Sequence, residues 1–123
     1  SLQIMLKLQV IGNLGADAEI KGNNGNEFLK FRVANTRKFV DSDGVVHEDT
    51  TWVNCAMRVP SQKLLSYLVK GQKIYVEGFP AFRTFKATRD GKTDYFVSVD
   101  LNVTQIELCG TNKERELKPD EPF

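Results

Sequence analysis

The sequence predicts an all-β domain with one helix, in which five strands close into a barrel, and three observations support this prediction. Apolar and polar residues alternate over several stretches of the 123-residue chain, which is the period of a half-buried strand. Clusters of turn residues such as Gly22–Asn26 separate these stretches. A single segment, between the third and fourth stretches, has the spacing of apolar residues that a helix requires.

The first strand is predicted from the alternation over Ile4–Val10, and we expect it to end where Gly12–Gly15 interrupts the pattern. A short segment to Lys21 and a turn come next, and a second strand follows them. Its apolar face, which we assign to the core, consists of Leu29, Phe31 and Val33. The alternate residues, which we expect to point away from the core, are Phe28, Lys30 and Arg32.

The third strand contains Trp52, whose face it shares with Asn54, Ala56 and Arg58. The opposite face is apolar and consists of Val53, Cys55, Met57 and Val59. Pro60-Ser61 then marks the start of the helix, and Gly71 is the expected position of its C-terminal cap. The residues at helical spacing between them are Leu64, Leu65 and Leu68.

Strand character returns at Ile74–Phe79 and continues in a hairpin that turns at Asp90-Gly91. The returning strand alternates through Tyr95, Val97, Val99, Leu101 and Val103. The order of these elements is that of a five-stranded OB-fold Greek-key barrel with its helix between strands 3 and 4. We therefore predict an OB-fold domain over residues 1–110 and a flexible polar tail over residues 111–123.

Composition narrows the class of protein further. The formal net charge is +1, and a chain of 123 residues buries a sizeable core without disulfide support. Cys55 and Cys109 form no disulfide framework and fit free thiols in a reducing compartment. No apolar run approaches the roughly 20 residues of a membrane span, and no secretory leader is recognisable. We therefore expect a cytoplasmic domain that does not bind a membrane.

Residues with catalytic or metal-binding chemistry are sparse. His47 is the only histidine, we assign it to a solvated acidic loop, and neither cysteine has a CxxC spacing. The Gly22–Gly25 segment lacks the Lys-Ser/Thr ending of a phosphate-binding loop. The acids that could supply oxygen ligands to a metal are Asp41, Asp43, Glu48 and Asp49. A solvated loop is the simpler interpretation, so we predict neither an enzyme nor a cofactor; a metal-dependent nuclease is the remote alternative.

Aromatic and basic residues are interleaved at three places. These are Phe28–Arg32, Arg37–Phe39 and Phe82–Lys86. Single-stranded nucleic acid is bound by this combination, because cations follow the phosphates while flat rings stack on the bases for about 1–3 kcal/mol each. The alternative is that strand phenylalanines belong to the core, which we expect for Phe31 and Phe82. Phe39 and Phe85 fit the core less well, because each is flanked by charge near a loop or hairpin tip, so residue types alone leave both interpretations open.

Four segments carry a more specific signal through their order and spacing. They are Val10–Gly15 with Asp17 and Glu19 behind it, Phe31–Ala34, Thr51-Trp52 and Tyr67–Gly78. In these segments the chain resembles the bacterial single-stranded DNA-binding protein family, and the likeness extends from Leu6 to Leu108. The resemblance implies an OB barrel, usually assembled as a homotetramer, that binds single-stranded DNA without strong sequence preference.

The resemblance also implies particular binding residues. The residues it implies for base stacking are Trp52, at the position of the family's third-strand tryptophan, Phe39 after the second strand and Phe85 on the last hairpin. The family's remaining aromatic position is Arg58 here, whose guanidinium can stack on a base and also bind phosphate. The basic residues expected to neutralise phosphates are Lys30, Arg32, Arg37, Arg58, Arg83 and Lys86.

The end of the chain is similar to the acidic Pro-Phe tip with which this family docks onto replication and repair proteins. The matching residues are Asp120, Glu121, Pro122 and Phe123. This tip has only two acids, and the flexible segment 111–118 spans only about 15 Å. A docked partner is therefore expected to lie close to the barrel.

We therefore expect the protein to bind and protect single-stranded DNA, independently of sequence, during replication, recombination and repair in the cytoplasm at the nucleoid. The alternative is an interaction module that resembles primosomal replication protein N. That relative has the same barrel, is generally dimeric and lacks the acidic tip. The ending Asp120–Phe123 favours the first function, whereas a dimer with weak DNA binding would favour the second.

Overall fold

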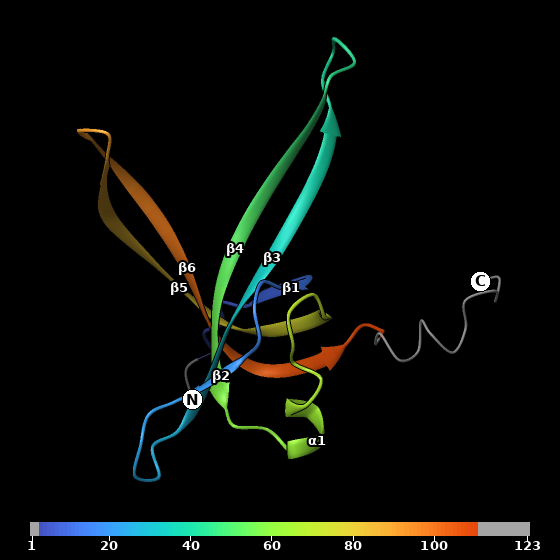
Figure 1. Ribbon diagram of the computed structural model, residues 1–123, viewed down its shortest axis with the longest axis vertical. Helices are drawn as coiled ribbons and strands as arrows, with labels where there is room; N and C mark the ends of the chain where they lie inside the picture. The colour runs from blue at the N-terminus through green and yellow to red at the C-terminus, as the bar shows by residue number, and fades with distance from the viewer. Residues whose placement is uncertain (1–2, 111–123) are drawn as a thin grey trace, which may run out of the picture.

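The computed structural model describes residues 3–110, which form a barrel with two long projecting hairpins (Figure 1). The elements in chain order are β1 (Leu8–Leu14), β2 (Glu19–Lys21), β3 (Phe28–Val40), β4 (Val46–Arg58), α1 (Gln62–Leu65), β5 (Lys73–Arg89) and β6 (Lys92–Leu108). Within residues 3–110, no helix is long and apolar enough to cross a membrane.

The barrel closes because β1 pairs with two strands. Residues Leu8–Asn13 pair antiparallel with β5, and Asn13 and Leu14 also pair with β3. The order β1-β5-β6-β4-β3 therefore joins end to end, with β2 added beside β3 and with β4 and β6 parallel to each other. The predicted five-stranded OB-fold barrel is confirmed, and its helix lies between the third and fourth barrel strands as expected.

The prediction for the first strand is wrong at both ends. Ile4 and Leu6 are exposed and precede β1, whereas Gly12–Leu14, expected as a break, belongs to the strand. A Cβ atom on Gly12 would overlap the carbonyl oxygen of Ala34 in β3, so glycine allows the two strands to approach closely. Gly12 therefore serves barrel closure rather than a turn.

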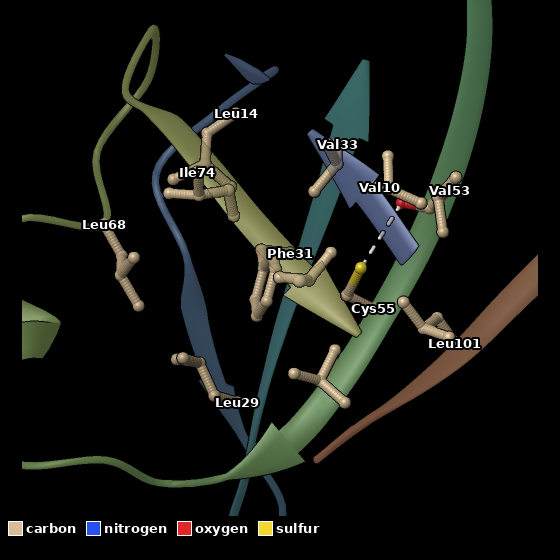
Figure 2. Close-up of a cluster of buried hydrophobic side chains, with 12 residues drawn as sticks. Val10, Leu14, Leu29, Phe31, Val33, Val53, Cys55, Leu68, Ile74 and Leu101 are labelled. Atoms are coloured by element: carbon tan, nitrogen blue, oxygen red, sulfur yellow. Dashed lines mark hydrogen bonds between the residues drawn. The ribbon is translucent and has the colours of Figure 1, made fainter. Parts of the chain in front are cut away.

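The barrel interior is filled by apolar side chains from all five barrel strands and from Leu68 after α1 (Figure 2). They are Val10, Leu14, Leu29, Phe31, Val33, Val53, Cys55, Leu68, Ile74, Val76, Leu101 and Val103. The core face predicted for the second strand is therefore confirmed. In the third strand Val53 and Cys55 are buried and Met57 packs against the core, whereas Val59 lies beyond the end of β4 and is not part of the core. Burial raises the pKa of the free Cys55 thiol to about 12, so this cysteine is an unreactive core residue.

The helix is shorter than predicted, because it ends at Leu65 and Gly71 does not cap it. The chain after Leu65 forms backbone hydrogen bonds with the end of β1 and with the segment that follows β1. The Ala18 amide donates to the Leu68 carbonyl at 2.9 Å, and the Gly71 amide donates to the Leu14 carbonyl at 2.8 Å. These contacts replace further helical turns and hold Leu68 in the core.

Two hairpins extend beyond the barrel and diverge from each other (Figure 1). We call residues 35–51 the β3–β4 arm and residues 82–98 the β5–β6 arm. The predicted turn at Asp90-Gly91 is confirmed, and its residues have φ values of +52° and +73°, as a two-residue hairpin turn of type I′ requires. The assignment of Phe82 to the core is wrong: it is 60% exposed, because β5 and β6 leave the barrel there as a two-stranded ribbon.

Candidate nucleic-acid interface

The outer face of the barrel carries an open groove of about 710 Å³ at the base of the two arms. The polar and exposed aromatic side chains that line it are Asp17, Glu19, Lys21, Lys30, Arg32, Trp52, Asn54, Phe79, Arg83, Asp100 and Asn102. We call this cavity the Trp52 groove. It brings together predicted site residues from β3, β4 and β5, namely Lys30, Arg32, Trp52 and Arg83.

Trp52 is fixed on two sides within this groove. The guanidinium carbon Cζ of Arg32 lies 4.4 Å from the centroid of the indole ring, which is a cation–π contact. A Cβ atom on Gly15 would lie 2.6 Å from the indole Cζ3, so the backbone at Gly15 packs directly against the ring. The side chain still remains 41% exposed. The exposed ring can stack on a base while the cation beside it binds the phosphate. Because both side chains are already held in place, binding costs little side-chain entropy.

Arg83 is paired inside the groove. Its Nε donates to one carboxylate oxygen of Asp100. The other oxygen accepts hydrogen bonds from Asn54 Nδ2 at 3.1 Å and from Ser98 Oγ at 3.0 Å. The hydrogen bond from Arg83 is the main cause that lowers the pKa of Asp100 to about 2. Asp100 is therefore ionised at neutral pH and offsets much of the charge of Arg83.

Within residues 3–110 none of the other five predicted cations forms an ion pair, and three of them lie in the barrel part of β3 and β4. These three are Lys30, Arg32 and Arg58. All three are exposed and alternate with buried or half-buried residues of β3 or β4. Their charges are therefore available to the phosphates of a bound strand.

A second groove, of about 510 Å³, adjoins the first. We call it the Arg58 groove, and it is lined by Glu27, Phe28, Ala56, Met57, Arg58, Phe79, Asn102, Val103 and Thr104. Ala56, Phe79 and Asn102 line both grooves, so the two cavities are contiguous. The structure therefore places Arg58 beside the groove that holds Trp52 rather than inside it.

Phe39 lies near the tip of the β3–β4 arm, 50% exposed and outside both grooves. Its ring stacks on His47 with 5.1 Å between centroids, and His47 Nε2 lies 2.7 Å from Asp41 Oδ2. The hydrogen bond with His47 is the main cause that lowers the pKa of Asp41. The assignment of His47 to a loop is wrong, because it lies in β4 opposite Phe39. Arg37 shares the pleat face of Phe39, opposite Asp49, and also lies outside the grooves.

Phe85 and Lys86 lie on the β5–β6 arm and alternate to opposite faces of the ribbon. Phe85 shares its face with Arg83 and stacks on Phe96 with 5.6 Å between ring centroids. It therefore extends the aromatic surface of the Trp52 groove along the arm. Lys86 lies on the other face, where its Nζ is 5.4 Å from the centroid of the Tyr95 ring. The structure thus separates two residues that the sequence groups together.

The acidic residues of the β3–β4 arm do not assemble a metal site. Glu48 and Asp49 lie in β4, whereas Asp41 and Asp43 lie in the turn before it. In the part of the chain that the structure describes, no three His, Cys, Asp or Glu side chains are placed to hold an ion. Asp41 Oδ1 instead accepts hydrogen bonds from the amides of Asp43 and Val45 at 2.9 and 3.0 Å, which fixes the turn.

Sequence reasoning missed Phe79, which is 58% exposed and lines both grooves. A signal for it was present, because Phe79 is out of phase with Ile74 and Val76, which are fully buried. Nothing in the sequence predicted Asp100 as the partner of an arginine. The predicted partner-binding tip, Asp120–Phe123, lies outside the described residues.

A closed OB barrel with exposed rings and unpaired cations on its outer face has the layout of proteins that bind single-stranded nucleic acid. The chain belongs to the single-strand binding protein family, whose model matches residues 5–108. The resemblance inferred from the sequence motifs is therefore confirmed. This is a family of binding proteins, and the expectation that the chain is not an enzyme agrees with it.

Relatives and a solved structure agree with this membership. The chain is 28% identical over 106 residues to single-stranded DNA-binding protein 1 of Chlorobaculum tepidum, covering 85% of this chain and 64% of that protein. It is 31% identical over 112 residues to the single-stranded DNA-binding protein of Neisseria meningitidis serogroup A, covering 88% and 62%. The chain thus spans less than two thirds of the length of these relatives. The structure of Plasmodium falciparum SSB in complex with ssDNA shares the fold, with a TM-score of 0.57 at 22% identity over 89% of this chain and 96% of that one.

Proposed function

We propose that this protein binds single-stranded DNA without sequence preference and protects it during replication, recombination and repair. The proposal rests mainly on the contact between Trp52 and Arg32. In it, an exposed ring and a cation without an ion-pair partner are held together in an open groove. A ring reads the face of a base and a cation reads a phosphate, so neither selects one base over another. Family membership and the names of the relatives support the same function.

In this proposal, bases stack on Trp52 in the groove and on Phe85 and Phe39 along the two arms. The unpaired cations that contact phosphates first are Lys30, Arg32 and Arg58. Further phosphate contacts come from Arg37, Arg83 and Lys86. The protein breaks and forms no covalent bond in the DNA. It keeps the strand unpaired and presents it to enzymes.

The proposal includes an assembly and a partner site. The barrel domain, residues 1–110, forms a homotetramer in the cytoplasm, and the tail, residues 111–123, recruits replication and repair proteins. The recruiting tip consists of Asp120, Glu121, Pro122 and Phe123. Sedimentation equilibrium tests the tetramer, and a dimer that binds DNA weakly would instead favour an interaction module resembling primosomal replication protein N. Deletion of the tip should leave DNA affinity unchanged while abolishing partner capture.

A titration with oligo(dT) tests the central claim, because Trp52 is the only tryptophan of the chain and its emission reports base stacking. We expect strong quenching that weakens as salt is added, with a log–log slope of about −0.7 for each phosphate contact. Absence of quenching, together with no retardation of a labelled strand in a gel, would overturn the proposal.

A further inference from the structure

Phe79 stands at the boundary between the Trp52 groove and the Arg58 groove. It lines both cavities together with Ala56 and Asn102, and its side chain is 58% exposed. Because Ala56 is small and Asn102 is polar, Phe79 supplies the large apolar surface at this boundary. A single exposed phenylalanine is common on protein surfaces, so its surroundings decide whether it has a role.

The fold fixes the backbone before Phe79, because Gly78 lies against β6 at a β-bulge. The pairing of β5 with β6 shifts register between Glu77 and Gly78, and Thr104 of β6 is left outside the ladder. A Cβ atom on Gly78 would overlap the carbonyl oxygen of Asn102, so glycine is needed for this close approach. The extra residue, Thr104, belongs to β6, so the bulge bends β6 against Gly78. Phe79 is exposed because β5 keeps its alternation through Ile74, Val76 and Gly78. The close approach of Gly78 to Asn102 fixes the backbone directly before Phe79.

The Arg58 groove repeats the chemistry of the Trp52 groove. Arg58 and Phe28 are cross-strand partners in β4 and β3, and Phe28 is 38% exposed. Arg58 forms no ion pair within residues 3–110. This groove therefore offers a ring and an unpaired cation, as the first groove offers Trp52 and Arg32. Phe79 lines both grooves and lies between the Trp52–Arg32 site and the Phe28–Arg58 site.

We infer that Phe79 is a base-stacking residue that carries a DNA strand from the Trp52 groove into the Arg58 groove. There Phe28 stacks on the next base and Arg58 contacts its phosphate. This inference rests on the proposed function and extends the binding path to a second, contiguous groove. The ligand at Phe79 is the face of any base of single-stranded DNA, so the subsite adds affinity without adding sequence preference.

Removal of the ring at position 79 tests the inference. Phe79→Ala should lower the affinity for oligo(dT) by about 5- to 150-fold, which corresponds to the loss of one base stack. Phe79→Leu keeps apolar bulk but removes the flat ring, and should lose nearly as much, whereas Phe79→Tyr should retain the affinity. Quenching of Trp52 at saturating DNA should persist in all three variants, because the Trp52 groove keeps its own ring and cations.

Phe82→Ala is the matched control. Phe82 is 60% exposed, close to the 58% of Phe79, and lies on the same strand, yet it lines neither groove. The affinity of Phe82→Ala for oligo(dT) should stay within about twofold of that of the unaltered protein, as expected for an exposed site outside the two grooves. Thermal unfolding of both alanine variants verifies that each remains folded.

A tryptophan at position 79 reports the contact directly. In the double variant Trp52→Phe/Phe79→Trp, oligo(dT) should quench the emission of the new indole. If the unaltered protein binds and its Trp52 is quenched, but Phe79→Ala and Phe79→Leu bind as tightly or the double variant is not quenched, the inference is wrong and the proposed function stands. If the unaltered protein does not bind oligo(dT), both fail.

Discussion

The barrel and the two arms are built from the same strands, yet they bury different residues. Within the barrel, β3 buries Leu29, Phe31 and Val33 almost completely, whereas beyond Val33 the same strand buries no further side chain. The pleat continues into the arm, but no further strand or helix covers the ribbon there. The difference teaches that the alternating pattern sets the direction of a side chain, while the neighbouring strands decide whether it is buried.

The two regions also differ in how their rings are paired. In the Trp52 groove the ring is paired with a cation, whereas on the arms the two rings expected to stack on bases are each paired with another ring. The arm pairs are Phe85 with Phe96 and Phe39 with His47. The Trp52 ring therefore has a cation in contact with it that can bind the phosphate of a stacked base, which the rings of Phe85 and Phe39 lack. We therefore expect the barrel to carry the stability and its groove to carry most of the binding free energy.

Two valines of the β5–β6 hairpin test whether the barrel, rather than the arm, provides the free energy of folding. Val76 is fully buried in the barrel, whereas Val97 is 64% exposed on the β5–β6 arm. Val76→Ala should lower the free energy of unfolding by about 2 kcal/mol, because it removes buried methyl groups and leaves a cavity. Val97→Ala should change it by less than about 0.5 kcal/mol. Urea unfolding measures both, and equal losses would show that the arm is packed in solution.

Trp52→Ala tests the division of binding. It removes the groove's ring and the partner that holds Arg32, so the affinity for single-stranded DNA should fall by about 10- to 150-fold. The loss should be the same for oligo(dT), oligo(dC) and mixed sequences, measured by the anisotropy of a labelled strand. Trp52→Phe is the control and should keep most of the affinity. A large loss on one sequence alone would contradict stacking as the mode of binding.

The sequence predicted the barrel faces of β3 and β4 correctly as far as Arg58, where β4 ends, because alternation there is unbroken. It placed Lys30 and Arg32 outward and Phe31 in the core, as the structure has them. The prediction from sequence was wrong where the same residue type fits two different structural roles. Gly12 has the character of a turn residue but permits barrel closure, and Phe82 continues the core pattern past the point where the core ends.

Features that depend on the curvature of the barrel could not be predicted. The β-bulge of β6 opposite Gly78 leaves no mark in composition, and the contact between the two grooves depends on how β4, β6 and β5 bring Ala56, Asn102 and Phe79 together. The pairing of Arg83 with Asp100 likewise joins β5 to β6 across the hairpin. Residue types therefore predicted the aromatic and basic side chains of the site. Closure of the sheet decides which of these side chains lie close together.

The aromatic residues on the arms should contribute less than Trp52. Phe85→Ala and Phe39→Ala should each lower the affinity for oligo(dT) by about fivefold, because each removes one stacking surface without disturbing a cation. Phe85→Ala should have the larger effect, since Phe85 shares a ribbon face with the residues of the groove. Titrations with short and long oligonucleotides measure both. A loss greater than that of Trp52→Ala would place the main site on the arms.

The last effect we predict is a gain in affinity. Asp100→Asn removes the carboxylate that offsets Arg83 but keeps an amide of the same size beside Asn54 and Ser98. The guanidinium then contacts phosphate without competition from the Asp100 carboxylate. If this strengthens Arg83 to one full phosphate contact, the affinity for oligo(dT) should rise about fivefold at 0.1 M salt and the log–log salt slope should steepen by about 0.7. Equal slopes for the two proteins would show that Asp100 positions Arg83 rather than competing with DNA for it.

The pH dependence of this gain follows from the lowered pKa of Asp100. An unperturbed aspartate titrates at about 3.9, whereas Asp100 titrates at about 2 because Arg83 stabilises its ionised form. The pair is therefore fully formed above about pH 4 and is lost only as the pH falls toward 2. Between about pH 5 and pH 8 the ratio of the two affinities should stay constant, since Asp100 keeps its charge throughout that range. A ratio that shrinks on acidification within this range would mean that Asp100 is neutralised there and that Arg83 does not hold it ionised.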